Sequence, residues 1–148
     1  MNVFEALRQD HDVQRELLEQ LADTSGDEQV RRQAFSQLKN ELTEHAAAEE
    51  KHFYAHLMQH EQTQDKARHS VAEHHDIDDS IEQLEKTDYS SPQWLQRFKE
   101  LHHLVSHHLE EEEQEVFQMG GKVLTDRQKE ELGSQYRNEM EKRRETSD

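Results

Sequence analysis

The stretch from Phe98 to Val116, FKELHHLVSHHLEEEEQEV, decides how the chain folds. Apolar residues recur at helical spacing around its second His-His pair: Phe98, Leu101, Val105 and Val116. At 100° per residue these side chains fall within about 60° of one another on a helix. His108 and Glu112 lie on the same side of that helix. Two good metal ligands therefore occupy an apolar stripe, and this placement needs an explanation.

Length and composition favour one all-helical domain. The chain has 148 residues, which is enough to bury a core. One proline and four glycines leave little from which to build sheets or long loops. Hydrophobic residues make up 30% and charged residues 35%, a balance that suits helices with narrow apolar stripes.

Charge and residue usage exclude several classes of function. The formal net charge of −16 argues against nucleic acid and against anionic membranes as partners. The sequence has no apolar run long enough to span a bilayer and no secretory signal, so we expect a cytoplasmic protein. The absence of cysteine excludes thiol catalysis, iron–sulfur clusters and thiolate-ligated haem. Twelve histidines, in contrast, point to metal.

Periodicity and capping residues predict five helices. Ser91 and Pro92 are a helix start, and Thr125 with Gln128 forms a capping box before the last helix. Gly120-Gly121 is predicted to end the fourth helix. The expected ranges are about 2–23, 28–60, 64–86, 91–119 and 126–143. Short connections favour an all-α, up-down-up-down four-helix bundle with a short C-terminal fifth helix.

Self-comparison shows an internal duplication of one helical hairpin, over about 2–60 and 64–119. Three pairs of potential ligands are each separated by 63 residues: His11/His74, His45/His108 and Glu49/Glu112. Much of the apolar frame keeps the same offset, for example Phe35/Phe98 and Leu38/Leu101. Each half thus offers one histidine from its first helix and a His-x-x-x-Glu from its second.

Helix geometry turns this repeat into a predicted metal site. Residues four apart stand one turn apart on one face, so each His–Glu pair can converge on one point. Two hairpins would bring four imidazoles and two carboxylates together inside the bundle, where unpaired carboxylates would be costly. Nitrogen and oxygen ligands favour non-haem iron first, then manganese or zinc.

The chain resembles the hemerythrin-like (HHE cation-binding) domain family. The resemblance rests on Asp10-His11, on His45 to Glu50, on Glu73-His74 and on His108 to Glu113. It implies a non-haem centre of two Fe ions, with the metal ligands His11, His45, Glu49, His74, His108 and Glu112. In that family pattern the first two histidines bind one iron, the other two histidines bind the second, and the two glutamates bridge.

One departure from the family pattern affects function. Oxygen-carrying members have a further histidine four residues after the one on the third helix, where this chain has Asp78. Asp78, a water or nothing then fills that position, so the site is more open. Three functions stay open: a module that binds a small ligand (O2, peroxide or NO) for sensing, storage or delivery; an enzyme that decomposes peroxide or handles nitric oxide; and metal buffering. No protein partner is indicated.

Several other residues offer competing interpretations. His107 with Glu111 forms a second His-x-x-x-Glu, but the repeat offset selects His108 and Glu112. Glu50 and Glu113 are alternative carboxylates, although Glu110, Glu111, Glu113 and Glu115 are predicted mainly as a solvated face. Glu49 with His52 and Glu100 with His103 have the Glu-x-x-His spacing of a ferritin-like bundle, yet Glu100 and His103 lie off the stripe. His52 and His56 are predicted to be outer hydrogen-bond partners or residues at the bundle end. Tyr54 and Tyr89 are candidate donors or packing residues, and His75, His102 and His103 are predicted to lie on the surface.

Overall fold

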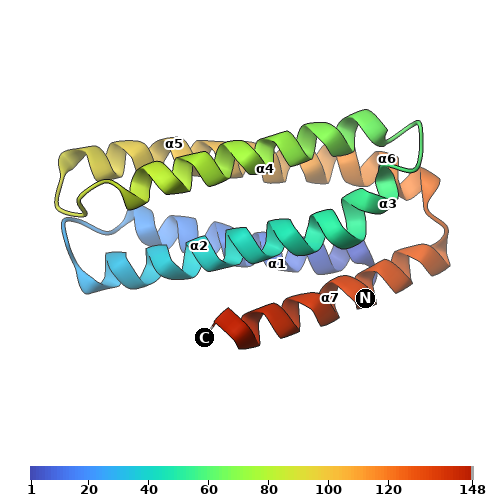
Figure 1. The fold of residues 1–148 in the computed structure, drawn as a ribbon, viewed down its shortest axis with the longest axis horizontal. Coiled ribbons are helices and arrows are strands. Elements are labelled where there is room, and N and C mark those ends of the chain that lie inside the picture. The colour runs from blue at the N-terminus through green and yellow to red at the C-terminus, as the bar shows by residue number, and fades with distance from the viewer. Residues whose placement is uncertain (148) are drawn as a thin grey trace.

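The computed structural model describes residues 1–147 as four long antiparallel helices with a fifth helix along one side (Figure 1). The elements are α1 (Val3–Ala22), α2 (Gln29–Glu49), η1 (Glu50–Tyr54), α3 (Ala55–Leu57), α4 (Gln64–Glu85), α5 (Pro92–Glu111), η2 (Glu112–Val116), α6 (Phe117–Val123) and α7 (Asp126–Ser147). The second long helix consists of α2, η1 and α3, and the fourth of α5, η2 and α6. Residues 1–147 contain no strand, so the predicted all-α bundle is confirmed.

Capping contacts start the helices where the sequence indicates. Ser91 accepts a hydrogen bond from the backbone of Gln93 at the start of α5, directly before the proline. The box before α7 is complete: the Gln128 N–H donates to the Thr125 hydroxyl over 3.1 Å, and the Thr125 N–H donates to the Gln128 side chain over 2.8 Å. Such caps satisfy the donors that the first helical turn leaves free.

Two five-residue π-helical segments, η1 and η2, interrupt the helices that carry the His-x-x-x-Glu motifs. One begins directly after Glu49 and the other at Glu112. A π turn holds an extra residue, so it rotates every residue that follows relative to a regular α-helix. The predicted stripe therefore shifts: Gly120 is buried, whereas Met119, predicted to face inward, is only partly buried.

The predicted helix end at Gly120-Gly121 is wrong. Helix α6 continues to Val123, and the backbone N–H of Leu124 still donates to the Gly120 carbonyl over 3.0 Å. Both glycines keep helical backbone angles; only Gly26, between α1 and α2, has a positive φ. The Cα of Gly120 faces Phe4 and Leu57, which lie at ordinary contact distance from the position of a Cβ.

The apolar core has two parts, and the predicted ligands lie between them. One cluster at the end near the chain's N-terminus includes Phe53, Tyr54, Phe117 and, from α7, Leu132, Tyr136 and Met140. The other cluster, toward the opposite end, includes Leu38, Leu42, Ile77, Trp94, Phe98 and Val105. Helix α7 is longer than predicted, 22 residues against about 18 in the range 126–143, and packs on α1 and α2. Within residues 1–147, no helix combines the length and the apolar character that a bilayer crossing needs.

Candidate metal centre

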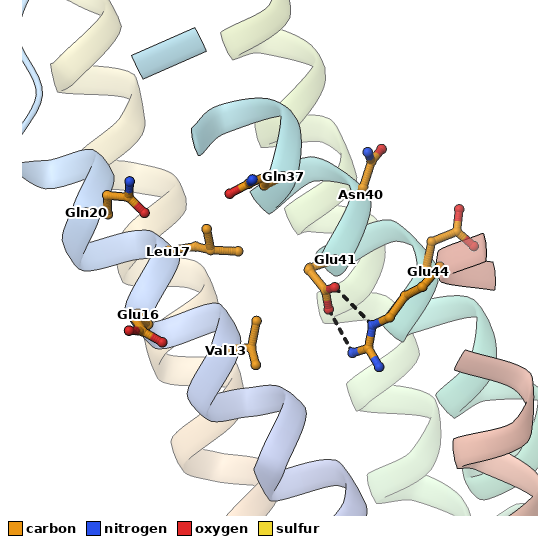
Figure 2. Close-up of a pocket in the computed structure, with 9 residues that line it drawn as sticks. Val13, Glu16, Leu17, Gln20, Gln37, Asn40, Glu41 and Glu44 are labelled. Carbon is orange, nitrogen blue, oxygen red and sulfur yellow. Dashed lines mark hydrogen bonds and ion pairs between the residues drawn. The ribbon is translucent and has the colours of Figure 1, made fainter. Parts of the chain in front are cut away.

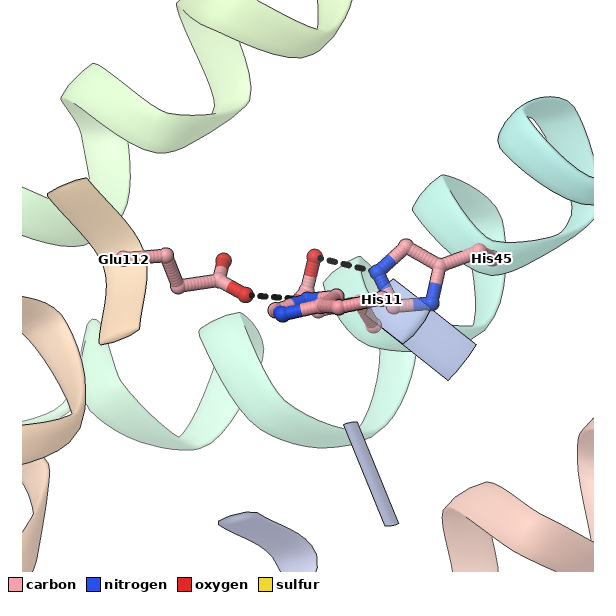
Figure 3. Close-up of side chains that lie close together, drawn as sticks. His11, His45 and Glu112 are labelled. Carbon is pink, nitrogen blue, oxygen red and sulfur yellow. Dashed lines mark ion pairs between the residues drawn. The ribbon is translucent and has the colours of Figure 1, made fainter. Parts of the chain in front are cut away.

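The structure brings all six predicted ligands together in the middle of the bundle. Their side chains come from all four long helices, and each is almost completely buried: His11, His45, Glu49, His74, His108 and Glu112. Figure 3 shows His11 of α1, His45 of α2 and Glu112 of η2 reaching toward one another from different helices. The apolar stripe noted in the sequence therefore surrounds a polar interior.

Two groups of potential ligand atoms form, and carboxylates join them. The ligand atoms of His11, His45, Glu49 and Glu112 all lie within 4.8 Å of one another, and so do those of Glu49, His74 and His108. Glu49 Oε1 is 3.4 Å from His45 Nε2 and 3.3 Å from His74 Nε2. A single carboxylate oxygen thus faces one histidine from each half.

Glu112 joins the two groups from the opposite direction. Its Oε1 lies 3.0 Å from His11 Nε2, and its Oε2 lies 3.8 Å from His108 Nε2. The two carboxylates therefore stand between two imidazole pairs, as the hairpin duplication predicts.

Each of the four imidazoles points its other nitrogen, Nδ1, at a fixed partner. His11 Nδ1 donates to Glu113 over 2.7 Å, His74 Nδ1 donates to Glu50 over 2.8 Å, and His108 Nδ1 donates to Glu73 over 2.8 Å. The fourth ring, His45, donates from Nδ1 to the Tyr136 oxygen over 2.5 Å. With Nδ1 protonated, each ring turns the Nε2 lone pair inward, which is the arrangement that metal-binding histidines use.

Inward-facing atoms at the centre have no hydrogen-bond partner among residues 1–147. They are Nε2 of His11 and of His45 and both oxygens of Glu49 and of Glu112. Buried polar atoms without partners carry a large desolvation cost. The remaining pair, His74 Nε2 and His108 Nε2, lies 3.1 Å apart, a separation typical of two nitrogens bound to one cation about 2.1 Å away. The residues present therefore fit a metal centre.

The electrostatics indicate the same need for positive charge. Burial and the nearby Glu49 charge raise the pKa of Glu112 well above its ordinary value. For Glu49, burial acts to raise the pKa, but the facing imidazoles of His45 and His74 outweigh it and hold the pKa well below the usual range. Without a cation, one carboxyl of the pair stays protonated, because two adjacent buried carboxylates repel each other.

Comparison with known proteins identifies the family. The sequence pattern of the hemerythrin HHE cation-binding domain matches residues 2–120. The chain belongs to the hemerythrin HHE cation-binding domain family. A crystal structure of an HHE cation-binding domain-containing protein from Mycobacterium kansasii superposes with a TM-score of 0.90 at 25% sequence identity, over 99% of this chain and 89% of that one. A comparison with curated proteins found no match.

Family membership and the buried His/Glu cluster together make this HHE domain a metal-binding helical protein. The family match ends at residue 120, whereas the Mycobacterium kansasii structure is matched over nearly the whole chain. The superposition thus extends the likeness to α7, which lies beyond the matched domain.

The outer partners were missed as a set when the sequence was read alone. Glu113 is predicted mainly to belong to a solvated face. Its side chain is only 16% exposed, however, and it accepts hydrogen bonds from His11 and from Arg15. Although burial acts to raise it, these hydrogen bonds lower the pKa of Glu113 to about 2. The signal was present in the sequence, since Glu50 and Glu113 are 63 residues apart, like the ligands.

Tyr136 was the least predictable of these partners. It belongs to α7, outside the duplicated hairpins, and its hydroxyl donates to Asp10 over 2.5 Å while it accepts from His45. Asp10 in turn accepts from Arg144 over 2.7 Å. A helix predicted only to lie against the bundle thus supplies a hydrogen-bonded chain that reaches the centre.

The competing residues lie elsewhere. His75 and His103 are exposed, and so is Glu100 of the ferritin-like spacing. His52 lies 3.2 Å from Glu139 of α7. Tyr54 is fully buried with its ring 5.6 Å from that of His74, and its hydroxyl has no partner among residues 1–147. The remaining residues considered, Tyr89, His56, His102 and His107, take no part in the inner centre.

A surface groove of about 530 Å³ lies between α1 and α2, beside Arg144 near the end of α7. Figure 2 shows its walls, with Val13 and Leu17 from α1 facing Gln37 and Glu41 from α2. None of the six inner residues lines this groove, so the groove is not part of the metal centre.

Proposed function

We propose that this protein holds a non-haem di-iron centre that binds dioxygen or a related small ligand for sensing, storage or delivery. In this proposal, His11 and His45 bind one iron, His74 and His108 bind the other, and Glu49 and Glu112 bridge. Iron is favoured by the all-nitrogen and oxygen ligand set, with manganese or zinc as possible substitutes. Bound iron would supply the electron exchange with oxygen-derived ligands that no side chain of this chain can supply.

The observation that carries the proposal is a small cavity directly beside the centre. Its volume is about 10 Å³, close to the room needed by one water-sized molecule. Its walls include inner histidines and apolar side chains: His45, His74, His108, Leu42, Ala46, Ile77 and Val105. Such a space is at the lower limit for one small molecule, so it disfavours a large substrate.

Two polar residues complete the cavity and give it direction. The amide nitrogen of Gln14 is buried and has no partner among residues 1–147, so it is free to donate a hydrogen bond to a bound ligand. Asp78, at the position of the family's fifth histidine, is exposed and also lines the cavity. The ligand position therefore has a donor on one side and a route toward solvent on the other.

The test begins with iron content and the optical spectrum. Anaerobically reconstituted protein should hold about two irons per chain and develop a visible band on adding oxygen that disappears when oxygen is removed. Gln14→Leu should leave the iron content unchanged and accelerate loss of the ligand, because the donor is removed. Less than one iron per chain would refute the di-iron assignment, and irreversible bleaching would refute carriage.

Peroxide decomposition is the second candidate, and Asp78 is the observation that favours it. An exposed carboxyl at the edge of the cavity can exchange protons between solvent and a ligand inside it. Asp78→Asn should then slow peroxide turnover while leaving iron content unchanged. Turnover that survives in His74→Ala or Glu112→Ala would exclude the assigned centre as its source.

A further inference from the structure

A second group of metal-binding side chains lies on the surface, where α4 and α5 run side by side. His69 and Glu73 stand one turn apart on α4, and His107 and Glu111 stand one turn apart on α5. The imidazoles are 57% and 59% exposed, whereas the two carboxylates are 16% and 20% exposed. Both histidines are therefore open to solvent above a half-buried pair of carboxylates.

The ligand atoms of His69, Glu73 and Glu111 lie within 4.8 Å of one another, and His107 contacts both carboxylates of this group. His69 Nε2 lies 3.5 Å from Glu73 Oε2 and 3.1 Å from Glu111 Oε1. His107 Nε2 lies 2.9 Å from Glu111 Oε2 and 3.7 Å from Glu73 Oε2. Tetrahedral ligands about 2.1 Å from a zinc-sized ion lie roughly 3.4 Å from one another, so these distances bracket the expected value.

The surrounding charge favours a cation. A hollow of about 300 Å³ next to the cluster is lined by His107, Glu110, Glu111, Gln114 and Glu115. Neutral imidazoles leave the two half-buried carboxylates of Glu73 and Glu111 uncompensated, with oxygens within 4.8 Å of each other. A cleft of one charge sign concentrates ions of the opposite sign.

The duplication supplies an independent reason to expect a cation here. Glu73 and His107 correspond, at the offset of 63, to Asp10 and Glu44 of the first half. There, α7 provides the cations: Arg144 binds Asp10 over 2.7 Å, and Arg143 binds Glu44 over 2.8 Å. No helix covers the corresponding face of α4 and α5 within the described chain (Figure 1). On this face Lys66 pairs with Glu115 over 3.1 Å, whereas the ion pairs of Glu73 and Glu111 among the described residues are all with histidines.

We propose that His69, Glu73, His107 and Glu111 form an outer site for one divalent first-row transition metal ion, such as Zn²⁺, in addition to the inner centre. Two imidazoles exclude magnesium and calcium as preferred ions, because those ions select all-oxygen ligands. One residue, Glu73, connects the outer site to the inner centre. Glu73 Oε1 accepts the hydrogen of His108 Nδ1, while Oε2 faces the outer site.

Zinc titration of the purified full chain tests the proposal. Isothermal titration of protein whose inner centre is already filled with Zn²⁺ should show one further ion per chain. The double variant His69→Ala/His107→Ala should bind that ion on the order of 100-fold more weakly, because half of the ligands are gone. His56→Ala/His60→Ala, which removes a partly buried histidine pair on another part of the chain, should bind like wild type.

Proton NMR of the zinc-filled protein tests the shared carboxylate. The Nδ1 hydrogen of His108 that is donated to Glu73 should shift when the outer ion is added, whereas that of His11, donated to Glu113, should not. Glu111→Gln provides a milder variant that keeps side-chain shape and should weaken the outer ion alone. The proposal is overturned if binding stops when the inner centre is full, or if His69→Ala/His107→Ala binds the additional ion as wild type does. Neither result depends on whether the inner centre binds oxygen.

Discussion

In the first hairpin the Nδ1 hydrogen of His45 reaches Asp10 through the hydroxyl of Tyr136, whereas in the second hairpin the Nδ1 hydrogen of His108 goes directly to Glu73. Asp10 and Glu73 are equivalent residues in the duplication, but the aspartate is one methylene shorter. The tyrosine fills the resulting gap. The first half is thus completed by α7, while the second half is complete by itself and keeps an open outer face.

This difference shows how a duplicated site becomes asymmetric without losing a ligand. The inner residues repeat and so do the outer carboxylates, because the ring nitrogens of each histidine need one partner inside and one outside. The two halves differ in which residue bonds the outer nitrogen of the histidine and in what supplies the positive charge next to the outer carboxylate. Arginines of α7 supply that charge on one side, and we propose that a metal ion supplies it on the other.

The largest expected effect comes from the residues that the two halves share. Glu49→Ala and Glu112→Ala should each reduce the iron content of reconstituted protein below one ion per chain, because each carboxylate contacts histidines of both halves. Mass spectrometry of the purified variants measures this loss, and Glu110→Ala on the exposed face is the control. If only one of the two variants loses metal, the two halves are not equivalent at the centre.

A smaller effect is expected from the residue that makes the halves unequal. Tyr136→Phe removes the hydroxyl that joins His45 to Asp10, so it should lower metal affinity about 10- to 100-fold. Competition with a chelator measures the change. Tyr89→Phe, at the far end of the bundle, should have no effect. Unchanged affinity in Tyr136→Phe would show that α7 is only a packing element.

The docking of α7 can be weakened without changing any polar side chain. A Cβ at Gly133 would lie 2.6 Å from the Met1 carbonyl oxygen and 2.7 Å from the Asn2 carbonyl carbon, so Gly133→Ala should cost about 1–3 kcal/mol of stability. Nothing lies within 4 Å of a Cβ at Gly121, which makes Gly121→Ala the matched control. Hydrogen exchange should accelerate in α7 and leave α4 unchanged. Equal acceleration in both helices would contradict a selective role for α7.

The smallest expected effect is a pH dependence of the stability of the metal-free protein. It arises because His11 and His74, although equivalent in the duplication, differ in pKa. Burial lowers the pKa of His11, with only partial compensation from Glu113. Burial also acts to lower that of His74, but hydrogen bonds to Glu49 and Glu50 outweigh it and raise the pKa to about 9. A raised folded-state pKa contributes stability that is fully present below pH 6.5 and is lost as pH rises through 9.

The unfolding temperature of the metal-free protein should therefore fall by a few degrees, on the order of 1 kcal/mol, between pH 6.5 and 9. Metal-filled protein should not show this decline, because a metal ion replaces the proton at His74. Thermal unfolding across that range, with NMR titration of the ring hydrogens, provides the measurement. If the doubly protonated imidazole at pH 8 is that of His11 and not that of His74, the predicted order of the two pKa values is wrong.

The sequence predicted the helices and the inner residues well because both follow from simple periodicities. Helical spacing placed His108 and Glu112 in an apolar stripe. The repeat offset of 63 residues then selected this pair over His107 and Glu111. The same helical spacing still placed Phe53, Leu57 and Val116 in the core, and it failed only at Met119, beyond the second π segment. Nothing in the composition of the glutamate-rich run marks a π turn, since it arises from packing around the centre.

The residues that bind the outer nitrogens of the histidines also differ in how well the sequence predicts them. Glu50 and Glu113 are 63 residues apart, and Glu73 corresponds to Asp10 at the same offset, so self-comparison extended by one residue predicts these carboxylates. Tyr136 has no counterpart in the repeat and no local pattern that distinguishes it from an ordinary packing residue. Its role depends on where α7 docks.

By itself, then, the sequence determined that two helical hairpins meet around four histidines and two glutamates, because a helix fixes which residues share a face. Only the tertiary structure showed that Glu50, Glu73 and Glu113 accept the outer hydrogens of the histidines, that His69 and His107 meet the same carboxylates on the surface, and how α7 reaches His45. Those outcomes depend on the distances between helices, and no spacing along a single chain segment specifies a distance to another segment.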